Sequence, residues 1–318
     1  MSHNILITCA SGYLGGTLLD ALSSASLPAY NTLYALVRTE AQAQAVKKYG
    51  ALPLFIDLSS PEAVTSTITS HKITIVYHLH EPRDLTTPTY IEALAQVKKE
   101  TGHEVHFLFT TGAKLFSEFA GAPTDRPLLD NDPALHEIHK AHAAHAPVSL
   151  LAQGVQANTL VVDTATRLGV RSYIFAPCIV YGPGRGFGNK ISIQTVAVVK
   201  AAKGVRRMYK VDKGRPTWPV CHVDDNAGLY VEILRGILNG KDIGHGEKGY
   251  FLAASGSMAW DDIYAAMGKA LKKRGVVDEE EVAIADEAVM EKMGEAMECP
   301  GAYVPMMLGG LYVSPLPV

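Results

Sequence analysis

The stretch that decides the fold reads Ile5-Leu6-Ile7-Thr8-Cys9-Ala10-Ser11-Gly12-Tyr13-Leu14-Gly15-Gly16. An apolar run of strand length leads into a glycine-rich turn and then into the helical pattern of residues 14–24. Backbone amides at such a helix start have no intrahelical partners, so they bind phosphate groups. Gly12 lets the backbone approach the phosphates, and Gly15 lets the helix pack on the strand. The stretch therefore predicts a pyrophosphate loop with contacts from Thr8, Ser11, Gly12, Tyr13, Leu14 and Gly15.

Strand-length apolar runs alternate with helix-length segments through the first half of the chain. The expected strands are 5–8, 32–37, 52–56, 73–77, 105–109 and 170–175, and the expected helices include 14–24, 90–101 and 151–168. Continuous apolar strands indicate a sheet that is covered on both faces, and the alternation with helices indicates parallel strands. The sequence therefore predicts an α/β fold with a doubly wound, parallel Rossmann-type sheet.

The pattern changes after residue 181, where glycines at positions 182, 184, 186 and 188 form a second glycine-rich loop. The remainder mixes short helices with one or two strands. We expect residues 1–181 to form the dinucleotide-binding domain, with residues 221–238 returning to it. Residues 182–220 and 239–318 are expected to form a smaller substrate lobe.

Composition argues against several classes of partner. The 318 residues carry a formal net charge of −3, which does not suit a general affinity for nucleic acid or for an anionic membrane. No apolar run reaches the roughly 18 residues of a membrane span, and the strand pattern that begins at Asn4 leaves no room for a signal peptide. The four cysteines are too scattered for a disulfide framework. We therefore expect a cytoplasmic protein without a nucleic-acid or membrane partner.

The glycine loop resembles the TGxxGxxG fingerprint of the extended short-chain dehydrogenases/reductases, the family that includes NAD-dependent epimerases and dehydratases. Further segments resemble family motifs in the family's order: Asp57-Leu58, His78-Leu79-His80, Pro177–Gly184 and His222–Asp225. The resemblance covers about residues 4–275 and implies a Rossmann fold with a nicotinamide dinucleotide cofactor. It implies cofactor contacts from Asp57, Leu58, His78, Leu79, His80, Thr110, Pro177, Ile179 and Val180.

Cys9 departs from the fingerprint, because it stands where the family has its first glycine. A position that requires a positive φ angle or close packing strains a cysteine. We expect a slightly shifted loop that still binds the cofactor.

Arg38 follows directly after the second expected strand, and no aspartate or glutamate ends that strand. An acidic residue there would hydrogen-bond the ribose hydroxyls of NAD, whereas an arginine pairs with a 2′-phosphate. Arg38 therefore favours NADP(H) as the cofactor, with an ordinary surface arginine as the alternative.

The residues that the family uses for proton transfer are missing. Family reductases combine Ser/Thr with Tyr-x-x-x-Lys, in which the tyrosine moves the proton and the lysine lowers its pKa. Counting back from Pro177 places this pair near Ser149 or Leu150 and near Gln153 or Gly154. The one Tyr-x-x-x-Lys in the chain, Tyr209–Lys213, falls in the expected substrate lobe, and we interpret it as a coincidence. The resemblance is therefore to an atypical member of the family.

Three residues are candidates to replace the missing pair. Gly112 occupies the slot of the family's catalytic serine, and the neighbouring Thr111 can take its role. Lys114 follows the same strand end, where burial would lower its pKa; the alternative is a solvated loop lysine. Tyr181 carries a phenol in the loop expected over the nicotinamide, where a structural role or a ribose contact is the alternative.

The polar segment 114–147 is expected to be an irregular excursion near the site. It contains His136, His139, His142 and His145, which would spiral around an α-helix rather than converge. We interpret them as a solvated polar face, with an acid–base role for one histidine as the alternative, and expect no metal site. We expect the acidic run 278–281 to cap a surface helix.

Three functions are compatible with these features. The first is an NADP(H)-dependent oxidoreductase that acts on a small carbonyl, alcohol or enone, and apolar residues at Leu150, Ile179 and Phe187 suit an aromatic or polyketide-like substrate. The second is a non-redox isomerase, dehydratase or lyase, and the third is a non-catalytic NADP(H) sensor. The family often dimerises through helices like 90–101 and 151–168, so a homodimer is expected.

Overall fold

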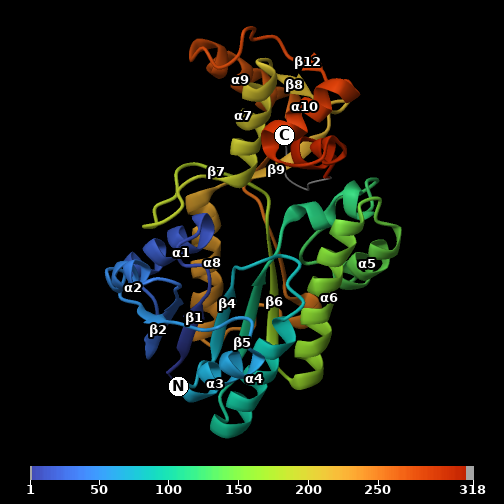
Figure 1. Cartoon of the computed structure of the whole chain (residues 1–318). Helices are drawn as coiled ribbons and strands as arrows, with labels where there is room; N and C mark the ends of the chain where they lie inside the picture. The colour runs from blue at the N-terminus through green and yellow to red at the C-terminus, as the bar shows by residue number, and fades with distance from the viewer. Residues whose placement is uncertain (1, 313–318) are drawn as a thin grey trace.

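A parallel seven-stranded sheet forms the centre of the computed structural model, which describes residues 2–312 (Figure 1). Its order is β3 (Leu52–Leu54), β2 (Thr32–Leu36), β1 (Asn4–Ile7), β4 (Ile75–His78), β5 (His106–Thr110), β6 (Arg171–Pro177) and β10 (Tyr250–Ala253). The chain reverses direction across the sheet between β1 and β4, so this pair marks the switch point at which doubly wound sheets bind ligands. The predicted fold class is confirmed.

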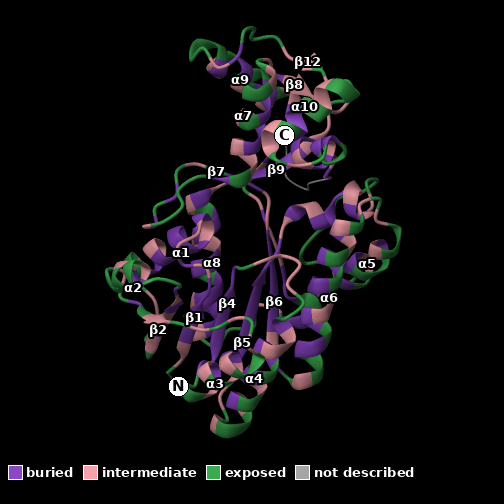
Figure 2. Ribbon diagram, viewed as in Figure 1, coloured by how far each residue is buried: buried purple, intermediate pink, exposed green. Residues whose placement is uncertain are grey.

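Helices cover both faces of this sheet. One face packs against α1 (Tyr13–Ser24), α2 (Glu40–Lys47) and α8 (Val223–Leu238), and the other packs against α3 (Pro61–Ser70), α4 (Thr87–Thr101) and α6 (Ser149–Leu168). The central strands β4 and β5 are buried along their whole length, as Figure 2 shows. Burial on both faces explains why these strands are continuously apolar rather than alternating.

A second group of elements lies above the carboxyl ends of the strands (Figure 1). It contains a three-stranded sheet of β11 (Gly256–Ala259), β9 (Thr217–His222) and β7 (Ile179–Tyr181), and a pair of β12 (Ala283–Ile284) and β8 (Tyr209–Lys210). Its helices are α7 (Ile193–Val205), α9 (Trp260–Lys273), α10 (Glu287–Met297) and α11 (Val304–Leu308). None of the helices in residues 2–312 combines the length and the apolar character needed to cross a membrane.

The strand pairing differs from the expected domain boundaries at two places. β10 lies in the stretch expected to belong to the substrate lobe, but it pairs with β6 and extends the main sheet. β7 lies within residues 1–181, yet it pairs with β9 in the small sheet. Both pairings join residues that are far apart in the sequence, so local patterns do not reveal them.

The expected solvated histidine face is wrong. The excursion after β5 contains helix α5 (Leu135–His142), which buries His136, His139 and His142 and leaves only His145 of the four exposed. Each buried ring has a hydrogen-bond partner: His136 Nδ1 lies 2.8 Å from the Tyr250 hydroxyl, His139 Nε2 lies 2.9 Å from Asn158 Nδ2, and His142 Nε2 lies 3.1 Å from the Leu115 carbonyl. These imidazoles are packed core residues.

The acidic run 278–281 does not cap a helix either. It lies in the connection between α9 and β12, where Asp278 pairs with Arg206 at 2.5 Å and Glu279 pairs with Arg207 at 2.9 Å. Asp278 and Glu279 thus form ion pairs with two arginines at the end of α7, which lie far away in the sequence.

The buried histidines predict that the fold loses stability in acid. Burial lowers the pKa of His142 to about 4 and that of His106 to about 3, and it lowers the pKa of His139 well below its ordinary value. Below pH 6.5 the unfolded chain therefore takes up protons that the folded chain does not. The free energy of unfolding should fall between pH 6.5 and 4, by up to about 1.4 kcal/mol per pH unit for each such group.

Urea unfolding at several pH values tests this expectation. His142→Gln should reduce the slope of the unfolding free energy against pH, whereas His145→Gln, at an exposed position, should leave the slope as it is. A wild-type unfolding free energy that stays constant from pH 6.5 to 4 would contradict the neutral buried state of these rings.

Candidate functional site

The glycine loop between β1 and α1 is held by contacts of its own backbone. Cys9 has a φ of 52°, in the left-handed region, and its carbonyl accepts a hydrogen bond from Gly12 N at 2.8 Å. The same carbonyl lies so close to Gly15 that a Cβ there would overlap it. Gly15 is therefore required for α1 to pack on the end of β1, and Cys9 occupies a conformation that favours glycine.

The start of α1 offers unpaired donors. No residue of the described chain accepts a hydrogen bond from the backbone N–H of Tyr13, Leu14 or Gly15. The helix has neither a side-chain cap nor an acidic residue in its first turn. Because these amides carry the positive end of the helix dipole, they are a candidate anion site.

The switch point between β1 and β4 is joined by a hydrogen bond from Leu79 N to Thr8 Oγ1 at 2.8 Å. Thr8 N donates in turn to the carbonyl of Tyr77 at 3.0 Å. The structure thus places Thr8 and Leu79, which the sequence assigns to the cofactor, side by side at the end of the two central strands.

The second glycine-rich loop, residues 182–192, lies directly against the first. A Cβ on Gly186 would lie 2.5 Å from Gly16 Cα, and a Cβ on Gly188 would overlap the carbonyl of Ser11. The hydroxyl of Tyr13 also donates to the loop at its start. Glycines at these positions let the two backbones touch, and the loop reaches from β7 across α1 (Figure 1).

Arg38 follows β2 and is exposed next to the glycine loop. Its backbone N donates to Gln42 Oε1 at 2.8 Å, and Gln42 Nε2 donates to Ser11 Oγ at 3.3 Å. Burial raises the pKa of the Cys9 thiol, and the nearby positive charge of Arg38 opposes this shift. The guanidinium has no ion-pair partner in residues 2–312, so its charge is available to a ligand.

Asp57 and Leu58 follow β3, where the resemblance implies adenine contacts. The Asp57 carboxylate is exposed and accepts hydrogen bonds from Ser59 N at 2.9 Å and from Ser59 Oγ at 2.6 Å, in the turn before α3. Leu58 is half-buried against the core. An adenine contact from this pair stays a prediction.

Gly154, one of the two expected positions of the missing lysine, packs closely against a neighbouring side chain. A Cβ on Gly154 of α6 would lie 2.7 Å from Leu115 Cδ2, so the Leu115 side chain fills the space into which a residue at 154 would project. Gln153, the other candidate slot, is exposed. Leu115 belongs to a short 3₁₀ turn, η1 (Ala113–Phe116), that directly follows the end of β5.

Two of the three catalytic candidates, Thr111 and Tyr181, differ in their exposure, and their catalytic roles stay predictions. The Thr111 hydroxyl is buried at the end of β5 and has no partner in the described part of the chain. Its neighbour Thr110 is engaged, because its Oγ1 lies 2.7 Å from the Tyr230 hydroxyl. Tyr181 ends β7 with 43% of its surface exposed. Its ring is packed edge-on against the ring of His222, with the two ring centres 5.3 Å apart. Pro177, Ile179 and Val180 form the turn and strand that carry Tyr181.

Lys114 is not a solvated loop lysine. Its Nζ is buried, donates to the Gly309 carbonyl at 2.6 Å and lies 3.8 Å from the centre of the Trp218 ring. Burial lowers its pKa to about 7, although Asp212 and Glu118 oppose the shift. The ammonium thus joins the end of β5 to the upper lobe.

The sequence of the chain matches one known protein family. Residues 5–245 match the family described as NAD dependent epimerase/dehydratase family. The chain belongs to this family. The recognition made from the glycine loop and the later motifs is confirmed, and the family supports a nicotinamide dinucleotide as the cofactor. No curated protein matches the sequence.

Solved structures of similar fold include epimerases and reductases. A UDP-glucose 4-epimerase of Thermus thermophilus in complex with NAD is 13% identical, with a TM-score of 0.56 over 89% of this chain and 86% of that one. A yeast methylglyoxal/isovaleraldehyde reductase complexed with NADPH is 11% identical, with a TM-score of 0.57 over 95% and 98%. Vestitone reductase from alfalfa is 13% identical, with a TM-score of 0.53 over 91% of both chains. At these identities the likeness shows the fold.

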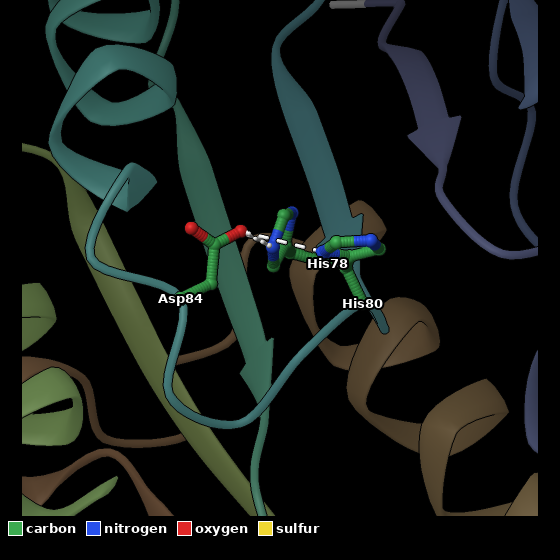
Figure 3. Close-up of side chains that lie close together, drawn as sticks. All are labelled: His78, His80 and Asp84. Atoms are coloured by element: carbon green, nitrogen blue, oxygen red, sulfur yellow. Dashed lines mark hydrogen bonds and ion pairs between the residues drawn. The ribbon is translucent and has the colours of Figure 1, made fainter. Parts of the chain in front are cut away.

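Sequence reasoning missed one group of polar residues. His78 and His80 at the end of β4 are joined by Asp84 from the following loop (Figure 3). His78 is fully buried against Tyr90 and Phe109, whereas the side chain of His80 is 47% exposed. The His-x-His-x₃-Asp spacing was the signal that could have revealed the group.

The left-handed conformation of Cys9 predicts that a glycine at this position stabilises the fold more than an alanine does. Cys9→Gly removes the steric cost of a Cβ at positive φ, whereas Cys9→Ala removes only the thiol and keeps that cost. The glycine variant should be more stable than the alanine variant by about 1 kcal/mol in urea unfolding, although glycine normally destabilises. Both variants should still bind a nicotinamide dinucleotide. A glycine variant less stable than the alanine variant would contradict the assigned conformation.

Proposed function

We propose that the chain is an NADP(H)-dependent oxidoreductase that acts on a small carbonyl, alcohol or enone. The observation that carries the cofactor preference is Arg38, an exposed guanidinium without an acidic partner beside the glycine loop. The 2′-phosphate that distinguishes NADP from NAD is the ligand group that such a guanidinium binds best, because the pairing is bidentate and charge-assisted.

The residues present fit this cofactor. The unpaired amides of Tyr13, Leu14 and Gly15 would hold the pyrophosphate, and Arg38 would hold the 2′-phosphate. The bound cofactor supplies the hydride chemistry. The unpartnered Thr111 hydroxyl would donate a hydrogen bond to the substrate oxygen, and the Tyr181 phenol would supply its proton.

An apolar substrate suits the surface that the second glycine-rich loop presents. The loop begins after Tyr181. Two isoleucines lie where it leads into α7, and they are exposed: Ile191 to 61% and Ile193 to 78%. Exposed apolar side chains at a binding loop favour an aromatic or polyketide-like molecule over a nucleotide sugar. Two proteins of similar fold are named as reductases, which agrees with this class of reaction. A homodimer through α4 and α6 stays a prediction.

The missing Tyr-x-x-x-Lys pair favours a second candidate, a non-redox isomerase, dehydratase or lyase. Leu115 packs against Gly154, one of the two expected lysine positions, and Lys114 bonds to the upper lobe. The two candidates differ in one readout. Stoichiometric oxidation of NADPH with a panel of carbonyl compounds supports the reductase, whereas substrate turnover with unchanged nicotinamide absorbance supports the non-redox enzyme.

The cofactor preference predicts an asymmetric effect of Arg38→Ala. Loss of a charge-assisted contact should weaken NADPH binding by about 10-fold or more and leave NADH binding within about twofold, measured by calorimetric titration. Arg274→Ala, at an exposed arginine of the upper lobe, is the matched control and should change neither affinity. Equal losses for both cofactors would overturn the assignment of the 2′-phosphate.

The proton-transfer role predicts that Tyr181→Phe lowers turnover by about 100-fold or more with little change in NADPH affinity. Tyr303→Phe, which removes a hydroxyl from an exposed tyrosine elsewhere in the upper lobe, should retain wild-type turnover. Steady-state NADPH oxidation with an accepted carbonyl compound measures both. Full activity of the Tyr181 variant would return this residue to a structural role.

A further inference from the structure

Two imidazoles and one carboxylate converge at the carboxyl end of β4 (Figure 3). His78 Nε2 lies 3.0 Å and His80 Nδ1 lies 3.6 Å from the same oxygen, Asp84 Oδ2. All three ligand atoms lie within 4.8 Å of one another. This is the spacing of groups that can share one cation.

Strand geometry and the following loop bring the three residues together. Successive side chains of an extended chain point to opposite sides, so His78 and His80 share one side while Leu79 packs into the core formed with α1 and α8. The chain then turns back, and Asp84 faces both rings. Thr86 donates to the second oxygen, Asp84 Oδ1, through its N at 2.8 Å and its Oγ1 at 2.6 Å. These bonds fix the carboxylate and direct Oδ2 toward the histidines.

Hydrogen bonds do not account for all of the contacts within this group. The 3.0 Å contact of His78 with Asp84 is a hydrogen bond, but the 3.6 Å contact of His80 is too long for one. Asp84 Oδ1 accepts the two hydrogen bonds from Thr86, so Oδ2 is the oxygen that both rings face. A cation at the common point would contact all three atoms.

We propose that His78 Nε2, His80 Nδ1 and Asp84 Oδ2 bind a divalent first-row transition-metal ion such as Zn²⁺ or Co²⁺. Two imidazole nitrogens and one carboxylate oxygen are the ligands that these ions share, whereas Mg²⁺ and Ca²⁺ prefer oxygen ligands throughout. The side chain of His80 is 47% exposed, so the remaining coordination positions open to solvent. They lie at the end of β4, adjacent to the strand that leads into the glycine loop.

The other histidine-containing group of this kind in residues 2–312 is a weaker candidate. It comprises His136, Glu137 and Glu247, but both carboxylates are exposed. At the β4 site, by contrast, two hydrogen bonds from Thr86 to Asp84 Oδ1 fix the carboxylate. The buried His78 Nδ1 has no partner, so the site lacks one support that tight zinc sites possess. We therefore expect moderate affinity.

The test is a calorimetric titration of the full chain with Zn²⁺ after treatment with a chelator, repeated with Co²⁺ and read from its visible absorption. The wild type should bind one ion per chain. His80→Ala, at a half-exposed side chain that leaves the core intact, should weaken binding at least about tenfold, and Asp84→Asn should do the same. Glu247→Gln and His145→Ala are the matched controls and should bind as the wild type does.

Circular dichroism verifies that each variant is folded. Absence of binding to the wild type, unchanged binding by folded His80→Ala, or loss of binding in Glu247→Gln would each overturn the site. Neither cofactor nor substrate is present in the titration, so the result is independent of the proposed reaction.

Discussion

Direct contact between two glycine-rich backbones is the constraint on which the arrangement of the whole molecule depends. Gly186 touches Gly16 at the first turn of α1, and Gly188 touches the carbonyl of Ser11. No side chain separates the two loops, so the loop that leads into the upper lobe is fixed against the loop that receives the cofactor. α8, which follows the small sheet, packs on α1 as well. The lobe is therefore anchored to the same helix at two of the places where the chain passes between the lobe and the main sheet domain.

The fold could be predicted from the sequence wherever the information was local. The first six strands of the main sheet and the helices α1, α4 and α6 follow from buried apolar runs and helical periodicity, because covering both faces of a sheet forces that pattern on the chain. β10 could not be assigned to this sheet, since its partner β6 lies more than 70 residues earlier. His136, His139 and His142 were misjudged for a related reason: their burial is decided by α6, η1 and Tyr250, not by their own spacing.

The candidate site likewise contains features that the local sequence predicts and features that it does not predict. The glycine loop and Arg38 could be singled out from the sequence, because a strand–turn–helix unit and the next strand end lie within about 40 residues of sequence, and their role in phosphate binding stays a prediction. The positive φ of Cys9 follows from the same unit, since the position requires a glycine-like conformation whichever residue occupies it. The filled lysine slot was not predictable, because it depends on the fit of Leu115 against Gly154, across the whole excursion that contains α5.

The 3₁₀ turn η1 shows how the loss of the usual pair and the burial of Lys114 are connected. Adjacent residues of this turn point in different directions: Leu115 packs into the gap at Gly154 on α6, and Lys114 extends into the upper lobe toward Gly309 and Trp218. A lysine at 154 would require the Leu115 side chain to move, and Leu115 is the neighbour of Lys114 in the same turn. The chain therefore uses the end of β5 to join α6 to the upper lobe. Among the three candidates for acid–base chemistry, Tyr181 is the one whose side chain is exposed, which is why the proposed proton transfer is placed there.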